Sequence, residues 1–572
     1  MATRLAAAQT WTLRVGMFLL PLAYSPFNYD SFVLPKLLLA RILVGVLLVL
    51  FVARIAASHT LVVKRTPLDL PIVAFLASAA LSSMFAENQN VALFGTYARY
   101  DGLLTMFTFA ALFWLSVQGL ADQAEARVLI RVLLASGYVV AATAILQSVH
   151  DSIQQRVIEP GAILPAFGSL GNPNVLGAFL ALVIALGAGE LLMAQSAASR
   201  IALLNLLVVS GLALLLSFSR SSWLAAAAGT AVVVVSQRKR LPRLGLLAPV
   251  FAVLVLALAV GYYLDGSGPL ERKVVARMLT VFDPNKIAGS RFGIWTDSVR
   301  LIASRPVLGY GPDNVGLVYP LFQTGDWGLA GSARQPIDKA HAELLQVAAT
   351  QGIIGLAAYA FLVVAFLRTF WRARRIDQAV LVFAGWIGYE LAVQLNFTAL
   401  ASALPFWIFA AVAMVSWEAV RTHIVVVDRR ASLVLGSAAG LAAAALTVLG
   451  VVVPYLADQR LREAVAADYA GRPQEAQGLA AQSRQLAPRE SVYAVEVGNT
   501  AFEQNQWAAA RTAYQDAAGL GTFNALVYRN LALADRNLGM LPEAREAARK
   551  AVQFDRFDPA NQALLAEFES KP

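Results

Sequence analysis

Three charged side chains stand where chemistry at a membrane surface would need them. Arg220 lies in the stretch SFSRSSWL between two apolar segments, and Arg291 is followed four residues later by Trp295. His341, one of only four histidines, precedes a long apolar run and has Glu343 two residues after it. A guanidinium binds oxyanions through a planar fork of donors, and an imidazole changes charge near neutral pH. Charged groups at a membrane boundary are costly and tend to be functional.

Each of these features also has a simpler interpretation. Arg220 would then be a side chain that reaches along apolar surface to lipid phosphates. An amphipathic helix at the membrane interface accounts well for Trp295 but less well for Arg291, and a histidine at a helix start is more often a cap or a packed residue than a catalyst. In GSLGNPNVLG, Asn172 and Asn174 flank a proline before an apolar run, so helix capping competes with substrate binding there.

The elements that must position these residues are membrane helices. Hydrophobic residues make up 58% of the 572-residue chain and charged residues 14%, with a mean hydropathy of +0.61, whereas soluble domains carry about 25% charge. The net charge of +10 then records membrane topology rather than nucleic-acid binding. The absence of cysteine excludes disulfides, thiolate metal sites and cysteine nucleophiles.

Apolar stretches of roughly 17–25 residues mark membrane-spanning helices. They predict an all-α, polytopic membrane protein with about thirteen spans. The predicted spans lie near residues 11–26, 35–55, 68–86, 103–121, 128–149, 173–195, 201–218, 222–236, 244–264, 353–371, 377–396, 399–420 and 431–456.

Flanking charge predicts how these spans are oriented. With a cytoplasmic N-terminus, the inside connections carry eighteen lysines and arginines, whereas the short outside connections carry four, namely Lys36, Arg99, Arg156 and Arg220. This asymmetry follows the positive-inside rule, and one span more or fewer would invert part of it. The large external loop at 265–350 and everything after the last span are therefore predicted to face outward.

The tail that begins at Ala457 is rich in Ala, Arg, Glu and Gln and repeats every 34 residues, the period of tetratricopeptide helical hairpins. The recurring positions are Ala476, Ala510 and Ala544, then Ala480, Tyr514 and Ala548, then Ser483, Ala517 and Ala551. We predict that residues 457–572 form an extracytoplasmic α-solenoid whose concave face binds a protein or peptide partner. The alternative is a helical extension that only stabilises the outer face.

Over residues 165–420 the sequence resembles the O-antigen ligase superfamily, membrane proteins that share the Wzy-type C-terminal domain. The motifs that carry the resemblance are GNPN before a span, SRSSWL, RxxxW with RPxxGxGPDN, and HxELLQ followed by GIIGL. They occur in this order and all on the predicted outer side. The resemblance implies a GT-C-like helical fold and an enzyme that moves a glycan from undecaprenyl diphosphate to an acceptor outside the cytoplasmic membrane.

The family's functional residues are two arginines and one histidine at the outer face, which map onto Arg220, Arg291 and His341. Guanidinium groups match a lipid diphosphate leaving group well, because they bind it bidentately and stay charged. They would stabilise the charge that grows on the leaving oxygen. The histidine would act as the base for an acceptor hydroxyl, and Glu343 would orient His341 or bind sugar hydroxyls.

Four further residues complete the predicted substrate-binding set, namely Trp295, Asn172, Asn174 and Arg99. We predict no metal and no cofactor, because the external segments contain no paired carboxylates of the DxD kind. The acidic residues noted there, Asp30, Asp101, Asp283, Asp313 and Asp326, are scattered along the sequence. The arginines would then have to carry the charge of the diphosphate.

The acceptor stays open, because Ala342 and Glu343 stand where the wider family often has an asparagine and an aromatic residue, and the thirteenth span and the tail are additions. Lipid A core, a growing polysaccharide or a protein serine would each offer a hydroxyl, so a ligase, a polymerase and a protein O-oligosaccharyltransferase all fit. A transporter is suggested by Glu190 and Glu390 inside spans, but a repeat of spans and a polar cluster at the midplane are missing. A scaffold that only presents the tail would leave the arginines and the histidine unexplained.

The predicted domains are a polytopic membrane glycosyltransferase domain at 1–456 and the helical repeats at 457–572. The predicted location is the bacterial cytoplasmic (inner) membrane, with the N-terminus inside and the repeats outside. The predicted partners are the undecaprenyl-diphosphate-linked glycan, a glycan, lipid or protein acceptor, membrane lipids and a protein at the tail, with no nucleic acid.

Overall fold

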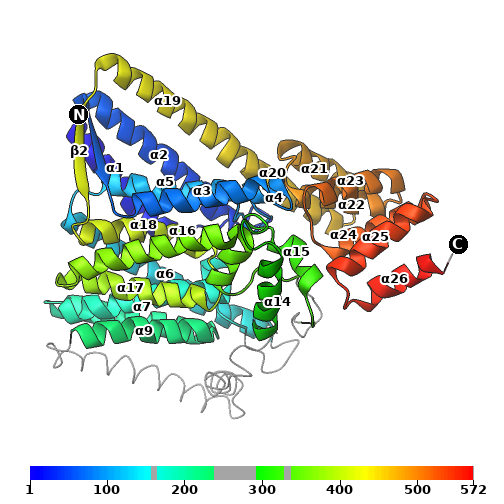
Figure 1. Cartoon of the computed structure of the whole chain (residues 1–572), viewed down its shortest axis with the longest axis horizontal. Helices are drawn as coiled ribbons and strands as arrows, with labels where there is room; N and C mark the ends of the chain where they lie inside the picture. Colours follow the sequence, from blue (N-terminus) through cyan, green and yellow to red (C-terminus); the bar gives the residue numbers. More distant parts are fainter. Residues whose placement is uncertain (156–163, 238–290, 327–335, 571–572) are drawn as a thin grey trace, which may run out of the picture.

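The computed structural model describes residues 1–155, 164–237, 291–326 and 336–570. Long helices lie side by side as a bundle, with a group of shorter helices at one end (Figure 1). Twelve of the thirteen predicted spans overlap bundle helices, and the ninth, 244–264, lies outside the described residues. The bundle helices are α1 (Ala2–Leu19), α2 (Leu34–Ser58), α3 (Asp69–Met84), α5 (Leu103–Gly119), α6 (Gln123–Gln155), α7 (Pro173–Met193), α8 (Ala197–Leu216), α9 (Arg220–Ser236), α16 (Glu343–Ala373), α17 (Asp377–Gln394), α18 (Leu400–Ser416) and α19 (Arg429–Thr447).

Six of the described helices are long and apolar enough to cross a membrane, namely α2, α6, α7, α8, α16 and the continuous helix that begins with α19. Four shorter apolar helices, α3, α5, α9 and α18, accompany them. The chain is therefore a multi-pass membrane protein, whereas the total of thirteen spans stays a prediction. The first predicted span, 11–26, is shifted, because α1 begins at Ala2 and ends at Leu19, close to Pro21, which has no backbone N–H with which to continue the helix.

Close contacts at the centre of the bundle fix how three helices run. Gly177 of α7 faces Ser222 of α9, and Gly229 of α9 faces Ala185 of α7, so α7 and α9 are parallel. Glycine at these positions lets the helices approach closely, as in other membrane bundles.

The contacts between α7 and α17 run in the opposite order. Ala181 meets Gly388, and Gly189 meets Leu381, so these two helices are antiparallel. The start of α7, the start of α9 and the end of α17 therefore lie together at one end of the bundle. This end also carries the group of shorter helices (Figure 1).

A two-stranded antiparallel sheet lies at the opposite end of the bundle, and the sequence patterns did not predict it. β1 (Thr60–Arg65) pairs with β2 (Arg421–Val426), and both strands come from connections that their positive charge assigns to the inside. Pairing requires both strands to lie on the same side of the membrane. This agrees with the even number of spans that is predicted between them.

Helix α16 contains the turn that its sequence predicts at Gly352, where φ is +63° and ψ is −159°. The segment RPVLGYGPDN wraps around this turn: Ile353 donates to the carbonyl of Pro306, and Gly311 donates to that of Thr350. Two helices flank this segment, α14 (Arg291–Ser304) before it and α15 (Val315–Phe322) after it. The turn therefore fixes the first part of α16, which begins at Glu343, against the connection between α14 and α15.

Gly352→Ala is expected to destabilise the protein by about 1–3 kcal/mol, the usual cost of a left-handed conformation at a residue other than glycine. A Cβ atom there would also lie 2.2 Å from the carbonyl oxygen of Val307. Thermal unfolding in detergent checks this, with Gly440→Ala as the control, because no atom lies within 4 Å of a Cβ at Gly440. Equal melting temperatures for the two variants would show that the turn does not depend on glycine.

The tail consists of short helices that pack against their neighbours in the sequence. A π-helical segment, Val448–Val452, joins α19 to the first of them without a break, so the helix runs through the predicted boundary at 456/457. All of the positions that recur every 34 residues are buried. The helices are α20 (Val453–Tyr469), α21 (Pro473–Leu486), α22 (Ser491–Glu503), α23 (Trp507–Gly519), α24 (Ala525–Asn537), α25 (Leu541–Phe554) and α26 (Pro559–Glu569).

These tail helices bind back onto the same end of the membrane bundle. Asn90 of α4 (Gln89–Phe94) donates to the carbonyl of Arg489 at 2.9 Å. Arg556 donates to the carbonyl of Pro320 in α15 at 3.1 Å. The tail therefore contacts α15, the helix that follows α14.

Candidate active site

His341 lies at the end of the bundle where α7, α9 and α17 meet, just before α16. Its backbone is left-handed, with φ at +51°, a conformation in which histidine is enriched among non-glycine residues. The indole N–H of Trp295 donates to its carbonyl at 3.2 Å, and the ring of Phe397 meets its imidazole edge-on with centroids 5.3 Å apart. The helix cap is Ala342, without a side-chain hydrogen bond. His341 therefore does not cap the helix.

The pKa of His341 falls from 6.5 to about 4, mainly because the imidazole is buried and in addition because the positive charge of Arg291 is nearby. Its Nδ1 atom is buried and has no hydrogen-bond partner among the described residues. The imidazole is therefore neutral at pH 7 and has an unused ring nitrogen. Such a group can accept a proton, provided that a substrate hydroxyl reaches it.

Arg291 is the first residue of α14, and one of its terminal nitrogens donates to the carbonyl of Leu395 at 2.8 Å. Leu395 directly follows α17. The buried Asp297 anchors α14, because it accepts hydrogen bonds from Tyr319 at 3.1 Å and from the hydroxyl of Thr324 at 2.8 Å. The structure thus brings Arg291 next to His341.

Arg220 is the first residue of α9. The hydroxyl of Ser219, directly before it, donates to Asn174 near the start of α7 at 2.9 Å. Because the starts of α7 and α9 lie with the end of α17, Arg220 belongs to the same end of the bundle as the carbonyl that Arg291 contacts. The two predicted arginines thus begin two different helices, α9 and α14, at the same end of the bundle.

The predicted binding residues take different positions. Asn172 caps α7 by accepting from the backbone N–H of Asn174 at 2.9 Å and from that of Val175 at 3.4 Å, so the capping interpretation describes its contacts. Glu343 accepts from the backbone N–H of Thr398 at 2.8 Å and lines the cavity described below. Trp295 donates to the backbone of His341 and thereby joins α14 to the segment that precedes α16.

A buried ionic network immediately before His341 was not anticipated. Lys339 binds Asp101 at 2.7 Å and Asp313 at 2.8 Å, and Arg99 binds Asp338 at 2.6 Å. Burial alone would lower the pKa of Lys339, but the carboxylates raise it above its ordinary value. Asp101 and Asp313, which look scattered in the sequence, are therefore adjacent, with an ammonium group between them.

Arg99, which the sequence suggests as a substrate ligand, is part of this network. Its guanidinium is paired with Asp338 and lies 5.4 Å from the ring centroid of Phe397, the ring that packs on His341. The only sequence signal for the network is the pair of charges in IDKAH, because Asp101 and Arg99 lie more than 200 residues away and Asp313 belongs to a different segment.

Lys339→Met is expected to cost about 3–5 kcal/mol of stability, because it leaves two carboxylates buried without their cation. Adding Asp313→Asn should recover part of the loss. Thermal unfolding measures both effects, with Lys550→Met on the exposed face of α25 as the control. A loss no larger than that of the control would show that the network contributes little to stability.

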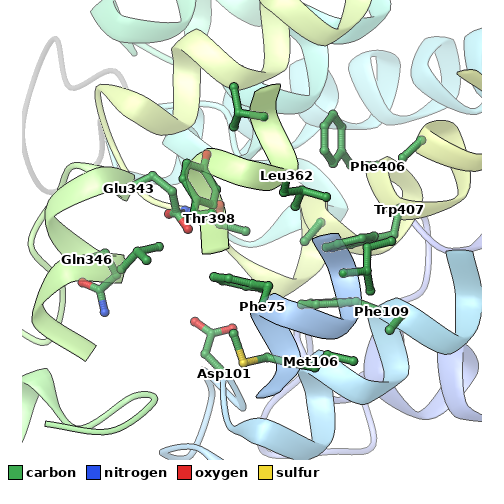
Figure 2. Close-up of a pocket in the computed structure, with 18 of the residues that line it drawn as sticks. Phe75, Asp101, Met106, Phe109, Glu343, Gln346, Leu362, Thr398, Phe406 and Trp407 are labelled. Carbon is green, nitrogen blue, oxygen red and sulfur yellow. Dashed lines mark hydrogen bonds between the residues drawn. The ribbon is translucent and has the colours of Figure 1, made fainter. Parts of the chain in front are cut away.

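A cavity begins on the other side of this network. Its volume is about 180 Å³. Asp101, Glu343, Gln346 and Thr398 lie toward one side, while aromatic and aliphatic side chains close the other (Figure 2). The apolar lining includes Phe75, Met106, Phe109, Leu362, Phe406 and Trp407.

Comparison with known proteins adds to this geometry. Residues 205–360 match the family model described as O-Antigen ligase, and this segment contains Arg220, Arg291 and His341. The GNPN motif at 171–174 and the tail lie outside the match, so the tetratricopeptide assignment stays a prediction. A comparison with curated proteins gave no match. Residues 205–360 therefore carry an O-antigen ligase domain, which confirms the resemblance that the motifs indicate.

Proposed function

We propose that this chain transfers a glycan from an undecaprenyl-diphosphate donor to an acceptor hydroxyl at the outer face of the bacterial cytoplasmic membrane. The observation that carries the proposal is the neutral, buried imidazole of His341, whose Nδ1 has no partner among the described residues, next to Arg291. A base and an anion-binding group are thus neighbours in a domain of the O-antigen ligase family.

In the proposed reaction, His341 takes the proton of the acceptor hydroxyl as the acceptor oxygen attacks the anomeric carbon of the donor. The bond between this carbon and the diphosphate oxygen breaks, and lipid diphosphate leaves with the electron pair. Arg291 and Arg220 stabilise the charge on the leaving diphosphate. The anionic donor would also raise the pKa of His341 when bound, so the base becomes stronger in the complex.

Purified protein in lipid nanodiscs, mixed with an undecaprenyl-diphosphate oligosaccharide and candidate acceptors, tests this function. The expected result is release of undecaprenyl diphosphate together with a new glycosidic bond on one acceptor. The same mixture compares lipid A core, a second lipid-linked glycan and a serine-containing peptide. Failure to bind the lipid diphosphate donor, measured separately, would refute the proposal.

The proposed sidedness rests on the positive charge of the connections that form β1 and β2. The end of the bundle that holds His341, the ionic network and the tail is the outer one, and the paired strands lie in the cytoplasm. The tail would then act as an external solenoid that binds a protein partner. A protease-cleavable tag after Pro572 should be accessible from outside the intact cytoplasmic membrane, and protection of the tag would reverse the assignment.

Turnover is expected to persist in excess chelator, because the two arginines rather than a divalent cation would neutralise the diphosphate. Even where two carboxylates meet, at Asp101 and Asp313, the ammonium of Lys339 lies between them. The measurement is the initial rate with and without EDTA. Loss of activity in EDTA and its return with magnesium would overturn this expectation.

A further inference from the structure

The cavity in Figure 2 changes in character from one end to the other. Its polar end holds Asp101, Lys339 and Glu343, and its apolar end holds Phe109 and Trp407, whose rings are stacked with centroids 6.1 Å apart. Along α16 the lining continues past the turn at Gly352 to Phe366, which is roughly 20 Å at 1.5 Å per residue. Most of the side chains along this slot are apolar, and the polar pair Tyr359 and Glu390 is joined by a hydrogen bond. The slot therefore suits a hydrocarbon chain, whereas a bulky, hydroxylated glycan would lose its hydrogen bonds to water there.

The polar end does not suit a diphosphate. Asp101, Asp313 and Glu343 all line it, and Lys339 is the cation between the first two. Carboxylates repel a phosphate group, but they accept hydrogen bonds from hydroxyl groups. The charge of this end therefore favours a neutral head group that carries hydroxyls.

The connection between α17 and α18 shows where this end lies relative to the base. Arg291 binds the carbonyl of Leu395, Phe397 packs on the imidazole of His341, and Thr398 lines the cavity. Along this short connection, the chain contacts first Arg291, then His341, and then lines the cavity. His341 is thus placed between an anion-binding group and a carboxylate-rich opening.

We propose that this cavity holds the hydrocarbon tail of the acceptor, a membrane-anchored amphiphile whose neutral, hydroxylated head group reaches His341 from the carboxylate side. The inference rests on the proposed function and narrows its acceptor to a lipid-anchored molecule. A soluble peptide would leave the apolar slot unused, and the diphosphate donor would approach from the side of Arg291.

Trp407 makes the binding measurable without any turnover. The probe is a maltoside with a brominated alkyl chain, because bromine quenches tryptophan fluorescence on contact. The fluorescence of Trp407 is isolated by subtracting the signal of a Trp407→Phe variant in nanodiscs. The comparison probe has the same brominated chain with a phosphate head group, which distinguishes an acceptor-like ligand from a donor-like one.

We expect saturable quenching of Trp407 by the maltoside, with an apparent affinity at least about tenfold higher than that for the phosphate probe, since like charges at a binding site are strongly unfavourable. Ala410→Phe should fill the slot, because Ala410 lines it, and should abolish the saturable quenching. Ala110→Phe fills it from α5 in case the first variant does not fold. Ala442→Phe, on an exposed face of α19, should leave the quenching unchanged.

Equal or tighter binding of the phosphate probe would overturn the proposal and assign the cavity to the donor lipid. Quenching that never saturates, or that persists in both filled variants, would show that no tail enters. Because the measurement uses neither donor nor turnover, a protein that binds the maltoside but transfers no glycan would refute only the proposed function.

Discussion

His341→Ala is expected to lower the turnover number by about 10²–10⁴-fold, the usual contribution of a general base, while the affinity for the lipid diphosphate donor stays nearly unchanged. The reason is the proposed division of roles: His341 offers a neutral Nδ1 that has no partner in the part of the chain that the structure describes, whereas the arginines would bind the anion. Single-turnover transfer and donor binding, measured on the same preparation, separate the two effects.

The backbone of His341 has to be considered in this experiment, because φ is +51° there and alanine is strained in that region. His341→Asn is the better second variant, since asparagine accepts a left-handed conformation but is no base. His59→Ala serves as the control, because His59 is exposed beside the paired strands at the far end of the bundle. Full turnover in His341→Asn would remove the histidine from the mechanism.

The pH profile gives an independent check. A base must be unprotonated to act, so the activity is lost as the pH falls through the pKa of His341. Because burial, together with Arg291, lowers this pKa to about 4, kcat/KM should stay level well below pH 6.5 before it declines. A decline centred on the ordinary pKa of histidine would mean that the imidazole is exposed in the working enzyme.

Local sequence signals predicted a large part of the site. The apolar segments located the helices, and Gly352 followed by IIGL predicted the turn in α16, because few residues other than glycine adopt the left-handed backbone found there. The RxxxW spacing placed Arg291 and Trp295 on one face of α14, and the structure uses both residues around His341. In each case a single short segment contains the whole signal.

The remaining features depend on partners that are far apart in the chain. Lys339 and Asp101 attract each other only after the fold has brought two external segments together, and neither segment shows the pairing on its own. The ring of Phe397, which packs on the imidazole of His341, also comes from a distant segment. Asn172 is a different case, because its signal is local but ambiguous. An asparagine before a helix suits both a cap and a substrate ligand, and in the structure Asn172 caps α7.

Arg291→Ala is expected to weaken donor binding and to lower turnover by about 10²–10³-fold, comparable to the loss of one strong donor at a developing oxyanion. Arg291→Lys should restore only part of the loss, because an ammonium keeps the charge but lacks the planar fork. Arg220→Ala should act in the same direction. Arg472→Ala in the tail is the control, since its ion pair with Glu475 is exposed and contributes little.

The loss of Arg291 should also change His341. Its positive charge lowers the pKa of the imidazole, so Arg291→Ala should move the acid limb of kcat/KM to higher pH, and Arg291→Lys should move it less. A variant that merely disturbs folding would reduce the rate at every pH and leave the position of the limb unchanged. If Arg291→Ala loses activity without such a shift, the arginine and the histidine do not act as neighbours, and the proposed pairing of base and anion site fails.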